Sequence, residues 1–307
     1  MKPSLFSVSY AGLWGQAALD LPRFIAHAAQ LGYPSVMLMG RRPHLSPLDA
    51  SPQLLASIRE ALDTHHVQCD VIAAYTDFRP GTAAEVPTIE LQIAYVESLA
   101  RIAAELGASV VRVFTAYESD GHDFHAAWRR VVEAIQETCD RAGQYGVTVA
   151  IQNHHDLALH TDALLELLAD IDRPNCRLGF DAWSPALRGE NLTEVARRAA
   201  PHVAITTNAD YIRLPRYAYR PHFVNYERVE PDWVRAVEFG TGFIDYPAFF
   251  KALREGGFNG IAAYEMCSPV RGGGSLANLD AYAAAYLEWM SRHELLDDRK
   301  AGASRNQ

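Results

Sequence analysis

Short apolar segments alternate with longer segments of helical spacing along nearly the whole chain. The apolar segments lie at 5–9, 36–39, 70–74, 110–114, 148–152, 176–180, 203–207 and 261–264. The segments with apolar residues at helical spacing lie at 21–31, 52–65, 88–106, 124–145, 161–169, 192–199, 246–256 and 276–292. Glycines such as Gly32, Gly107 and Gly146 follow several of them, as is common at helix ends. The pattern therefore predicts eight strand–helix repeats.

Eight such repeats in a chain of 307 residues predict an α/β fold, a single (β/α)8 TIM barrel. The strand segments are apolar on both faces, as buried parallel strands must be. An open, doubly wound sheet is the alternative, and it would need a glycine-rich dinucleotide turn after the first strand. Residues 9–15, Ser-Tyr-Ala-Gly-Leu-Trp-Gly, do not match that turn. We expect residues 1–296 to form one domain and the charged tail 297–307 to fray.

One connection, residues 210–238, is unusually long and is rich in tyrosine, arginine and proline. Loops of this length inside a compact domain are usually functional. Its composition indicates a lid over the functional site, or an interface with a neighbouring subunit, which leaves a homo-oligomer open.

Charge and cysteine usage narrow the class of protein. The net charge is −9, which argues against nucleic acid as a partner because phosphate binding needs a basic face. The four cysteines are scattered and form no CxxC pair, as is typical of a reducing compartment. No apolar run approaches membrane length, and residues 1–4 lack a signal-peptide pattern. We expect a cytoplasmic protein with no membrane partner.

Polar residues stand at the ends of the last four predicted strands: Gln152, Asp181, Asn208 and Glu265. In a parallel barrel, chemistry lies where the strands end. One polar residue could merely cap its strand, but four in succession indicate a functional site at the barrel mouth.

Other candidate residues follow the remaining strands. Arg41 and His44 follow the second strand and could bind an anion or sugar hydroxyls. Aromatic faces suit sugar stacking, and the aromatic residues Trp14, Tyr75 and Trp183 follow the first, third and sixth strands. Arg271 precedes a run of glycines that could form an anion-binding loop. For each of these a purely structural role in the loops stays open.

Two further candidates are charged or titratable. His154 and His155 follow Gln152 directly, and imidazole suits acid–base work near neutral pH. Arg112 lies within an apolar strand and therefore needs a compensating partner, which could be structural or a substrate.

Several motifs resemble those of the xylose isomerase-like TIM-barrel superfamily, the sugar phosphate isomerase/epimerase family. Residues 239–246, Phe-Gly-Thr-Gly-Phe-Ile-Asp-Tyr, resemble its G-x-G-x-I-D block, and Tyr264-Glu265 its last-strand glutamate. Residues 151–154, Ile-Gln-Asn-His, resemble its L-E-N-H motif, and residues 179–181, Gly-Phe-Asp, its sixth-strand aspartate. The resemblance covers nearly the whole chain and supports the barrel prediction.

The resemblance implies a divalent metal held by a glutamate, an aspartate, a histidine and a second glutamate. Carried over by position, the ligands are Gln152, Asp181, a residue within 206–208 taken as Asn208, and Glu265. Gln152 departs from the pattern, and residues 206–208 contain no histidine. Such an oxygen-rich, weakly charged site would favour Mg²⁺ or Mn²⁺, while a metal-free sugar site stays open.

The same departure bears on the reaction. An amide cannot accept a proton at neutral pH, so Gln152 removes one of the two bases that epimerisation uses in the family. Isomerisation or elimination that needs only one base stays possible. Residues 152–154 resemble the Q-N-H motif, and residues 264–269 the Y-E-x-C-x-P motif, of family members that eliminate from keto-glycosides. We therefore expect a sugar isomerase/epimerase-like or keto-glycoside lyase-like enzyme with a small carbohydrate substrate.

The expected acid–base pair of this enzyme is Glu265 and His154. A catalytically degenerate sugar-binding or regulatory barrel is the alternative. A DNA endonuclease of this fold is disfavoured by the charge and by the scarcity of metal ligands at the strand ends.

Overall fold

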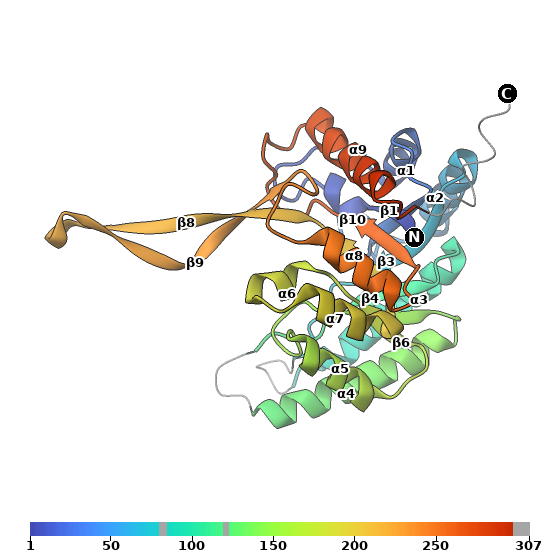
Figure 1. Cartoon of the computed structure of the whole chain (residues 1–307). Helices are drawn as coiled ribbons and strands as arrows, with labels where there is room; N and C mark the ends of the chain where they lie inside the picture. The colour runs from blue at the N-terminus through green and yellow to red at the C-terminus, as the bar shows by residue number, and fades with distance from the viewer. Residues whose placement is uncertain (80–84, 119–122, 297–307) are drawn as a thin grey trace.

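The computed structural model describes residues 1–79, 85–118 and 123–296. Eight parallel strands form a closed barrel in the order β1-β10-β7-β6-β5-β4-β3-β2 (Figure 1). They are β1 (Lys2–Phe6), β2 (Ser35–Met39), β3 (Gln68–Ala73), β4 (Val110–Val113), β5 (Thr148–Gln152), β6 (Cys176–Gly179), β7 (Val203–Asn208) and β10 (Ile261–Tyr264). The prediction of a TIM barrel is confirmed.

Helices follow the strands and cover the outside of the barrel (Figure 1). They are α1 (Leu21–Gln30), α2 (Pro52–His65), α3 (Thr88–Leu106), α4 (Phe124–Gly143), α5 (Thr161–Ile171), α6 (Trp183–Arg188), α7 (Leu192–Ala199), α8 (Tyr246–Glu255) and α9 (Leu276–Arg292). Side chains that accept a backbone N–H begin many of them, for example Asp20 before α1 and Ser51 before α2. The sequence pattern missed only the short helix α6 among these.

The first strand lies earlier than expected. β1 covers Lys2–Phe6 rather than residues 5–9, and residues Ser7–Tyr10 form a 3₁₀ helix. The Ser7 hydroxyl accepts a hydrogen bond from the Met39 backbone N–H at 2.9 Å, so a side chain takes the place of a ladder partner. The apolar pattern could not reveal that substitution.

Two apolar layers hold the barrel together. Side chains inside it include Phe6, Met39, Val71 and Ile205, and a larger layer lies between the strands and the helices. Because side chains alternate across a strand, each strand contributes to both layers. Towards the ends of β4, β5 and β7, the inward positions become polar, which places polar groups at the barrel mouth.

The connection 210–238 forms a long antiparallel hairpin rather than a loop. Its strands are β8 (Asp210–Arg220) and β9 (Asn225–Val237), paired from Asp210↔Val237 to Arg220↔Asn225. The hairpin projects away from the barrel (Figure 1). A lid over the protein's own mouth is therefore wrong. Its aromatic and β-branched residues favour strands, which the loop interpretation overlooked.

Two expectations concern the rest of the chain. The tail 297–307 lies outside the described residues. No helix of the described part of the chain has the length and apolar character needed to cross a membrane.

Candidate active site

Hydrogen bonds between side chains connect three strand ends at the barrel mouth. The Gln152 Nε2 atom at the end of β5 donates to Asp181 Oδ2 and to Thr207 Oγ1, each at 2.9 Å. The backbone N–H of Ser184 donates to the other Asp181 oxygen at 3.1 Å. Gln152, Asp181 and Thr207 are all buried. They form a polar cluster on β5, on β7 and after β6.

Glu265 follows β10 and adds a second carboxylate to this cluster. Its backbone N–H donates to the Asn208 carbonyl at 3.0 Å, which continues the β10–β7 ladder and turns the side chain inward. The pKa of Glu265 is raised to about 7, chiefly by burial; the positive charge of Arg112 opposes this rise, and the negative charge of Asp181 adds to it. A carboxyl group of this pKa can exchange protons near neutral pH.

The pKa of Asp181 is raised as well, to about 6. Burial is the cause, and the hydrogen bonds from Gln152 and Ser184 oppose it because they favour the ionised form. The mouth thus holds two neighbouring carboxyl groups that both resist ionisation.

Arg112 supplies a buried positive charge inside the barrel. Its Nη1 atom donates to the Ala74 carbonyl at 3.0 Å, and its guanidinium lies 4.0 Å from the centre of the Phe114 ring and 5.0 Å from that of Tyr75. Among the described residues it forms no direct ion pair, and its buried Nε has no hydrogen-bond partner. The expected compensation therefore comes from aromatic faces and from the field of Glu265 rather than from a contacting carboxylate.

Arg41 and Tyr75 continue this wall of the mouth. The Arg41 guanidinium lies 4.5 Å from the centre of the Tyr75 ring, so Tyr75 contacts two guanidinium groups. Burial raises the pKa of Tyr75 to about 12, which keeps its hydroxyl neutral. The structure places these two predicted residues together with Arg112.

His154 lies in an aromatic wall that includes Phe114, the ring that also contacts Arg112. Its ring lies 5.0 Å from Phe114 and 5.7 Å from Trp183. The His155 backbone N–H donates to His154 Nδ1 at 2.9 Å, so the neutral ring carries its proton on Nε2. Burial lowers the pKa of His154 to about 4, and the charges of His155 and Arg112 add to this effect. The ring is therefore neutral at pH 7.

Besides Arg112 Nε, two more buried polar atoms of the mouth have no partner among the described residues. They are Gln152 Oε1, an acceptor, and Trp183 Nε1, a donor. Buried polar groups are nearly always hydrogen-bonded, so orphaned atoms in a site indicate places where a ligand would bind. Both belong to residues that the sequence pattern singled out.

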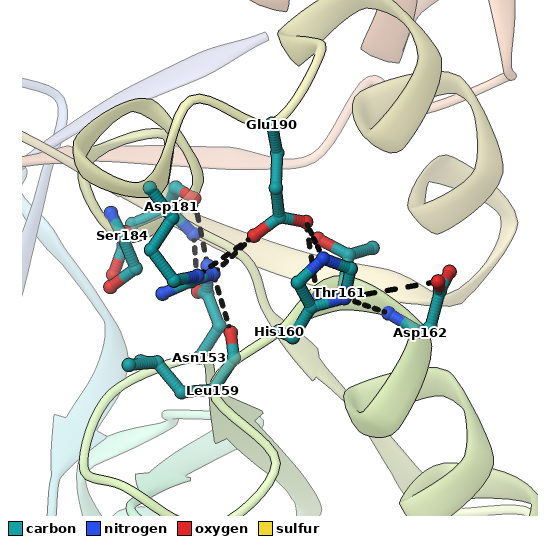
Figure 2. Close-up of polar contacts among 9 residues, drawn as sticks. Asn153, Leu159, His160, Thr161, Asp162, Asp181, Ser184 and Glu190 are labelled. Atoms are coloured by element: carbon teal, nitrogen blue, oxygen red, sulfur yellow. Dashed lines mark hydrogen bonds and ion pairs between the residues drawn. The ribbon is translucent and has the colours of Figure 1, made fainter.

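A pair of reciprocal hydrogen bonds fixes the end of β5 against the residue that follows β6. Asn153 Nδ2 donates to the Asp181 carbonyl at 2.9 Å, and the Asp181 N–H donates to Asn153 Oδ1 at 2.8 Å. Figure 2 shows a second link beside this pair, in which Glu190 accepts hydrogen bonds from the Thr161 N–H and from Arg188. Asn153 is thus a positioning residue that sequence reasoning did not single out.

Asn208 does not join the polar cluster. Its Nδ2 atom donates to the Ala263 carbonyl and Thr206 Oγ1, each at 2.9 Å, and to the Tyr286 hydroxyl of α9 at 3.3 Å. Side chains alternate along β7, so Asn208 faces the helices while Thr207 faces the barrel interior. Thr207, rather than the expected Asn208, is therefore the seventh-strand residue whose side chain reaches the polar cluster.

The ring nitrogens of His44 likewise have hydrogen-bond partners within the fold. Its two ring nitrogens contact Ser7 Oγ and the Leu19 carbonyl, each at 3.0 Å, and the side chain is 6% exposed. Burial lowers its pKa. The prediction that His44 binds substrate is not supported by this placement.

Trp14 and Arg271 lie on exposed loops after β1 and β10. The Trp14 loop is fixed beside Glu265, because Gln16 Nε2 donates to the Met266 carbonyl at 2.7 Å. The backbone carbonyl of Arg271 accepts a hydrogen bond from the Tyr282 hydroxyl at 2.9 Å, and the Arg271 side chain is exposed. Trp14 thus borders the mouth.

Several oxygen atoms of the mouth bear on the divalent cation that the sequence led us to expect. No group of three or more His, Cys, Asp or Glu side chains able to hold a metal occurs in residues 1–79, 85–118 and 123–296. However, Asp181 and Glu265 repel each other, and the orphaned Gln152 Oε1 is an unused oxygen donor. An all-oxygen set of this kind suits Mg²⁺ or Mn²⁺ better than zinc.

Comparisons with known proteins agree with the fold. The sequence model of the xylose isomerase-like TIM-barrel family matches residues 25–293 of the chain. No match was found among curated proteins. Among solved structures, D-allulose 3-epimerase from Methylomonas sp. has a TM-score of 0.72 and 17% identity, with 95% of this chain and 98% of that chain covered.

Two further solved structures are similar over their whole length. The probable 3-DHS dehydratase AsbF from Bacillus anthracis has a TM-score of 0.71 and 16% identity, with 95% of this chain and 99% of that chain covered. A xylose isomerase-like TIM-barrel protein from Mycobacterium smegmatis, solved in complex with magnesium, has a TM-score of 0.69 and 14% identity, with 96% of each chain covered. At these identities the likeness concerns the fold.

Proposed function

The chain belongs to the xylose isomerase-like TIM-barrel family, and we propose that it is an enzyme that removes a proton next to the carbonyl group of a sugar or keto-sugar. The observation that carries the proposal is the position of Glu265 directly after β10 at the barrel mouth, beside the hydrogen-bonded cluster of Gln152, Asp181 and Thr207. Burial there raises the pKa of Glu265 to about 7. A base of this pKa is ionised in a useful fraction of molecules at neutral pH and can also return the proton.

Glu265 takes the proton from the carbon beside the carbonyl. The electron pair of that C–H bond forms a C=C double bond with the carbonyl carbon, and the π pair of the carbonyl moves onto its oxygen. The neutral His154 ring offers its Nε2–H to that oxygen or to a leaving hydroxyl, since His154 Nδ1 already accepts from His155. Arg112 lowers the pKa of Glu265 and keeps more of it ionised. Trp183 supplies an aromatic face for the sugar ring.

A divalent cation held by Asp181, Glu265 and the oxygens of Gln152 and Thr207 would polarise the carbonyl when bound. Gln152 also donates to Asp181 and so orients it. Because Gln152 cannot accept a proton, the chain lacks a second base at that position. The proposal therefore favours one-base isomerisation or elimination over two-base epimerisation.

Hydrogen exchange tests the proposal without knowledge of the final product. The protein, with and without Mg²⁺, is incubated in D₂O with ketohexoses such as D-allulose, D-tagatose and D-fructose, and with 3-keto-glycosides. Proton abstraction replaces the C–H hydrogen by deuterium, which NMR detects. The matched pair of variants is Glu265→Gln and Glu60→Gln, the latter an exposed glutamate on α2.

The alternative is a sugar-binding protein without catalysis. It is favoured over the enzyme if sugars bind at the mouth while neither exchange nor turnover occurs in any member of this panel.

A further inference from the structure

The β8–β9 hairpin is an exposed arm that projects from the barrel (Figure 1). Beyond a bulge between Leu214 and Arg216, the tip of the arm, Arg216–Val229, is solvent-exposed over nearly all of its residues. Phe223 and Val224 are 79% and 80% exposed, and Tyr226 is 66% exposed. An exposed apolar surface of this kind in a folded protein indicates a binding surface.

The base of the arm is fixed, so the arm has a defined direction. The Asp210 carboxylate accepts hydrogen bonds from the backbone N–H groups of Tyr211, Gly240 and Gly242 at 2.7–3.0 Å. The Phe243 N–H donates to the Tyr211 carbonyl at 2.8 Å, and Arg271 N–H donates to the Ala236 carbonyl at 3.0 Å. The arm is thus a rigid extension of the end of β7, at the mouth.

The side chains of the tip contact one another across the two strands, but few other residues of the chain cover them. Tyr219 and Tyr226 pair across the strands with ring centres 5.3 Å apart, and Arg220 forms an ion pair with Glu227. A two-stranded hairpin alone is marginally stable in water, so a second surface must cover this one to stabilise it. At about 3.3 Å per residue, the eleven residues of β8 extend roughly 35 Å, enough to reach another molecule.

The charge of the tip is opposite to that of the rest of the chain. The tip carries three arginines and one glutamate, a net charge of +2, although Arg228 also pairs with Glu230 and Asp232 just beyond the tip. The whole chain carries −9, so the remainder carries −11. A second copy of this chain therefore attracts the tip.

The rim of the mouth offers a complementary surface in the same chain. We define the rim as Trp14, Tyr117, Glu118 and Asp156, which lie on the loops after β1, β4 and β5. Trp14 is 39% and Tyr117 45% exposed, and Tyr117 stacks on His155 at 3.9 Å. The rim thus combines open aromatic faces with exposed carboxylates, which match the tyrosines and arginines of the tip.

We propose that the arm of one copy lies across the mouth rim of a second copy, so that two chains exchange arms in a symmetric dimer. Because the arm begins at its own mouth, one two-fold axis can place each arm on the other mouth. Each active site is then bordered by residues of both chains. This proposal does not depend on which reaction the site catalyses.

Photo-crosslinking tests the proposal directly. A benzoylphenylalanine replaces Tyr219, and isotopically light and heavy chains are mixed before irradiation and peptide mapping. We expect crosslinks between light and heavy chains that join residue 219 to the rim segments 11–17, 115–118 or 154–158. The same probe at His65, an exposed residue at the end of α2, is the control and gives no crosslink to the rim. Crosslinks only within one chain, or only to the outer helices, overturn the proposal.

Shortening the arm provides the second test. An Asn-Gly turn replaces residues 215–232 and joins Leu214 to Trp233, which are paired in the wild type. We expect light scattering to give twice the chain mass for the wild type and the mass of one chain for the shortened variant, whose thermal unfolding remains cooperative and whose helical circular dichroism signal is retained. The full-length variant Arg220→Glu, which keeps the arm, shows a weaker dimer, and the exposed Arg59→Glu does not. A monomeric wild type, or a dimer that survives both changes, overturns the proposal.

Discussion

At the scale of single residues, the chemistry depends on which side chains of the mouth carry charge. Gln152 and Thr207 contribute neutral groups, so Asp181 and Glu265 provide the negative charge and Arg112 the positive charge. The protonation states of Asp181 and Glu265 therefore depend on their burial and on the charges of Asp181, Glu265 and Arg112, which act on one another.

The pH dependence of the reaction follows from the pKa of Glu265. The base must be ionised, so kcat/KM rises as pH increases through about 7 and is lost as pH falls below it. Arg112→Met removes the charge that lowers this pKa, so the acid limb, the fall of kcat/KM on the acidic side, shifts to higher pH. Arg112→Lys keeps the charge, so the limb stays nearer its wild-type position. A limb that does not move in Arg112→Met contradicts the charge coupling.

The His154 ring has a separate role as hydrogen-bond donor. Removal of a positioned acid–base group costs about 10²- to 10⁴-fold in rate, so His154→Ala lowers kcat by at least the lower bound. His155→Ala is the matched comparison, because His155 stacks on Phe114 and Tyr117 rather than facing Trp183. If kcat is unchanged in His154→Ala with wild-type folding, the ring serves only the aromatic wall.

At the scale of elements, the G-x-G-x-I-D motif fixes the base of the arm. A Cβ atom on Gly242 would lie 2.0 Å from Asp210 Oδ1, whose carboxylate is held by backbone N–H groups of the motif. The motif therefore requires glycine because the backbone approaches the carboxylate so closely. This is a structural use of a motif that the family resemblance alone could not explain.

Gly242→Ala is expected to lower the free energy of unfolding by about 1–3 kcal/mol, as overpacking commonly does. Gly143→Ala is the control, because a Cβ there would meet only the Asn175 side chain, at the longer distance of 3.3 Å. Urea unfolding of both variants measures the difference. Equal stabilities would show that the chain near Asp210 relaxes freely.

Most elements could be predicted from the sequence because buried parallel strands and amphipathic helices leave strong local patterns. The strand at Ile261–Tyr264 and the helix at Leu276–Arg292 have the bounds that the pattern predicted. The arm and the choice between Asn208 and Thr207 could not be predicted in this way. The first depends on pairing between distant residues, and the second on which of two adjacent side chains faces the barrel interior.

At the scale of the whole molecule, the buried groups of the mouth couple folding to pH. Asp181 and Glu265 have folded pKa values of about 6 and 7, above their ordinary values, so they favour folding at low pH and lose that contribution as pH rises through these values. His154 and His155 have folded values of about 4, below the ordinary value, so they favour folding at higher pH. The two effects oppose each other.

The double variant Asp181→Asn/Glu265→Gln removes the first effect. Relative to the wild type, its free energy of unfolding should increase by about 2 to 5 kcal/mol as pH rises from about 4 to 7. Urea unfolding in the presence of EDTA measures this difference at each pH. For the control variant Glu60→Gln, the difference from the wild type should not change with pH. A difference that is constant with pH would show that these carboxyl groups titrate normally.

The most direct test of the account is deuterium exchange in the sugar panel defined above, measured by NMR for the wild type and Glu265→Gln. We expect the wild type to exchange the hydrogen beside the carbonyl of at least one sugar of the panel. Glu265→Gln should exchange it at least about 10²-fold more slowly, with Glu60→Gln unaffected. Exchange at the same rate in the wild type and in a folded Glu265→Gln variant would contradict the assignment of Glu265 as the base.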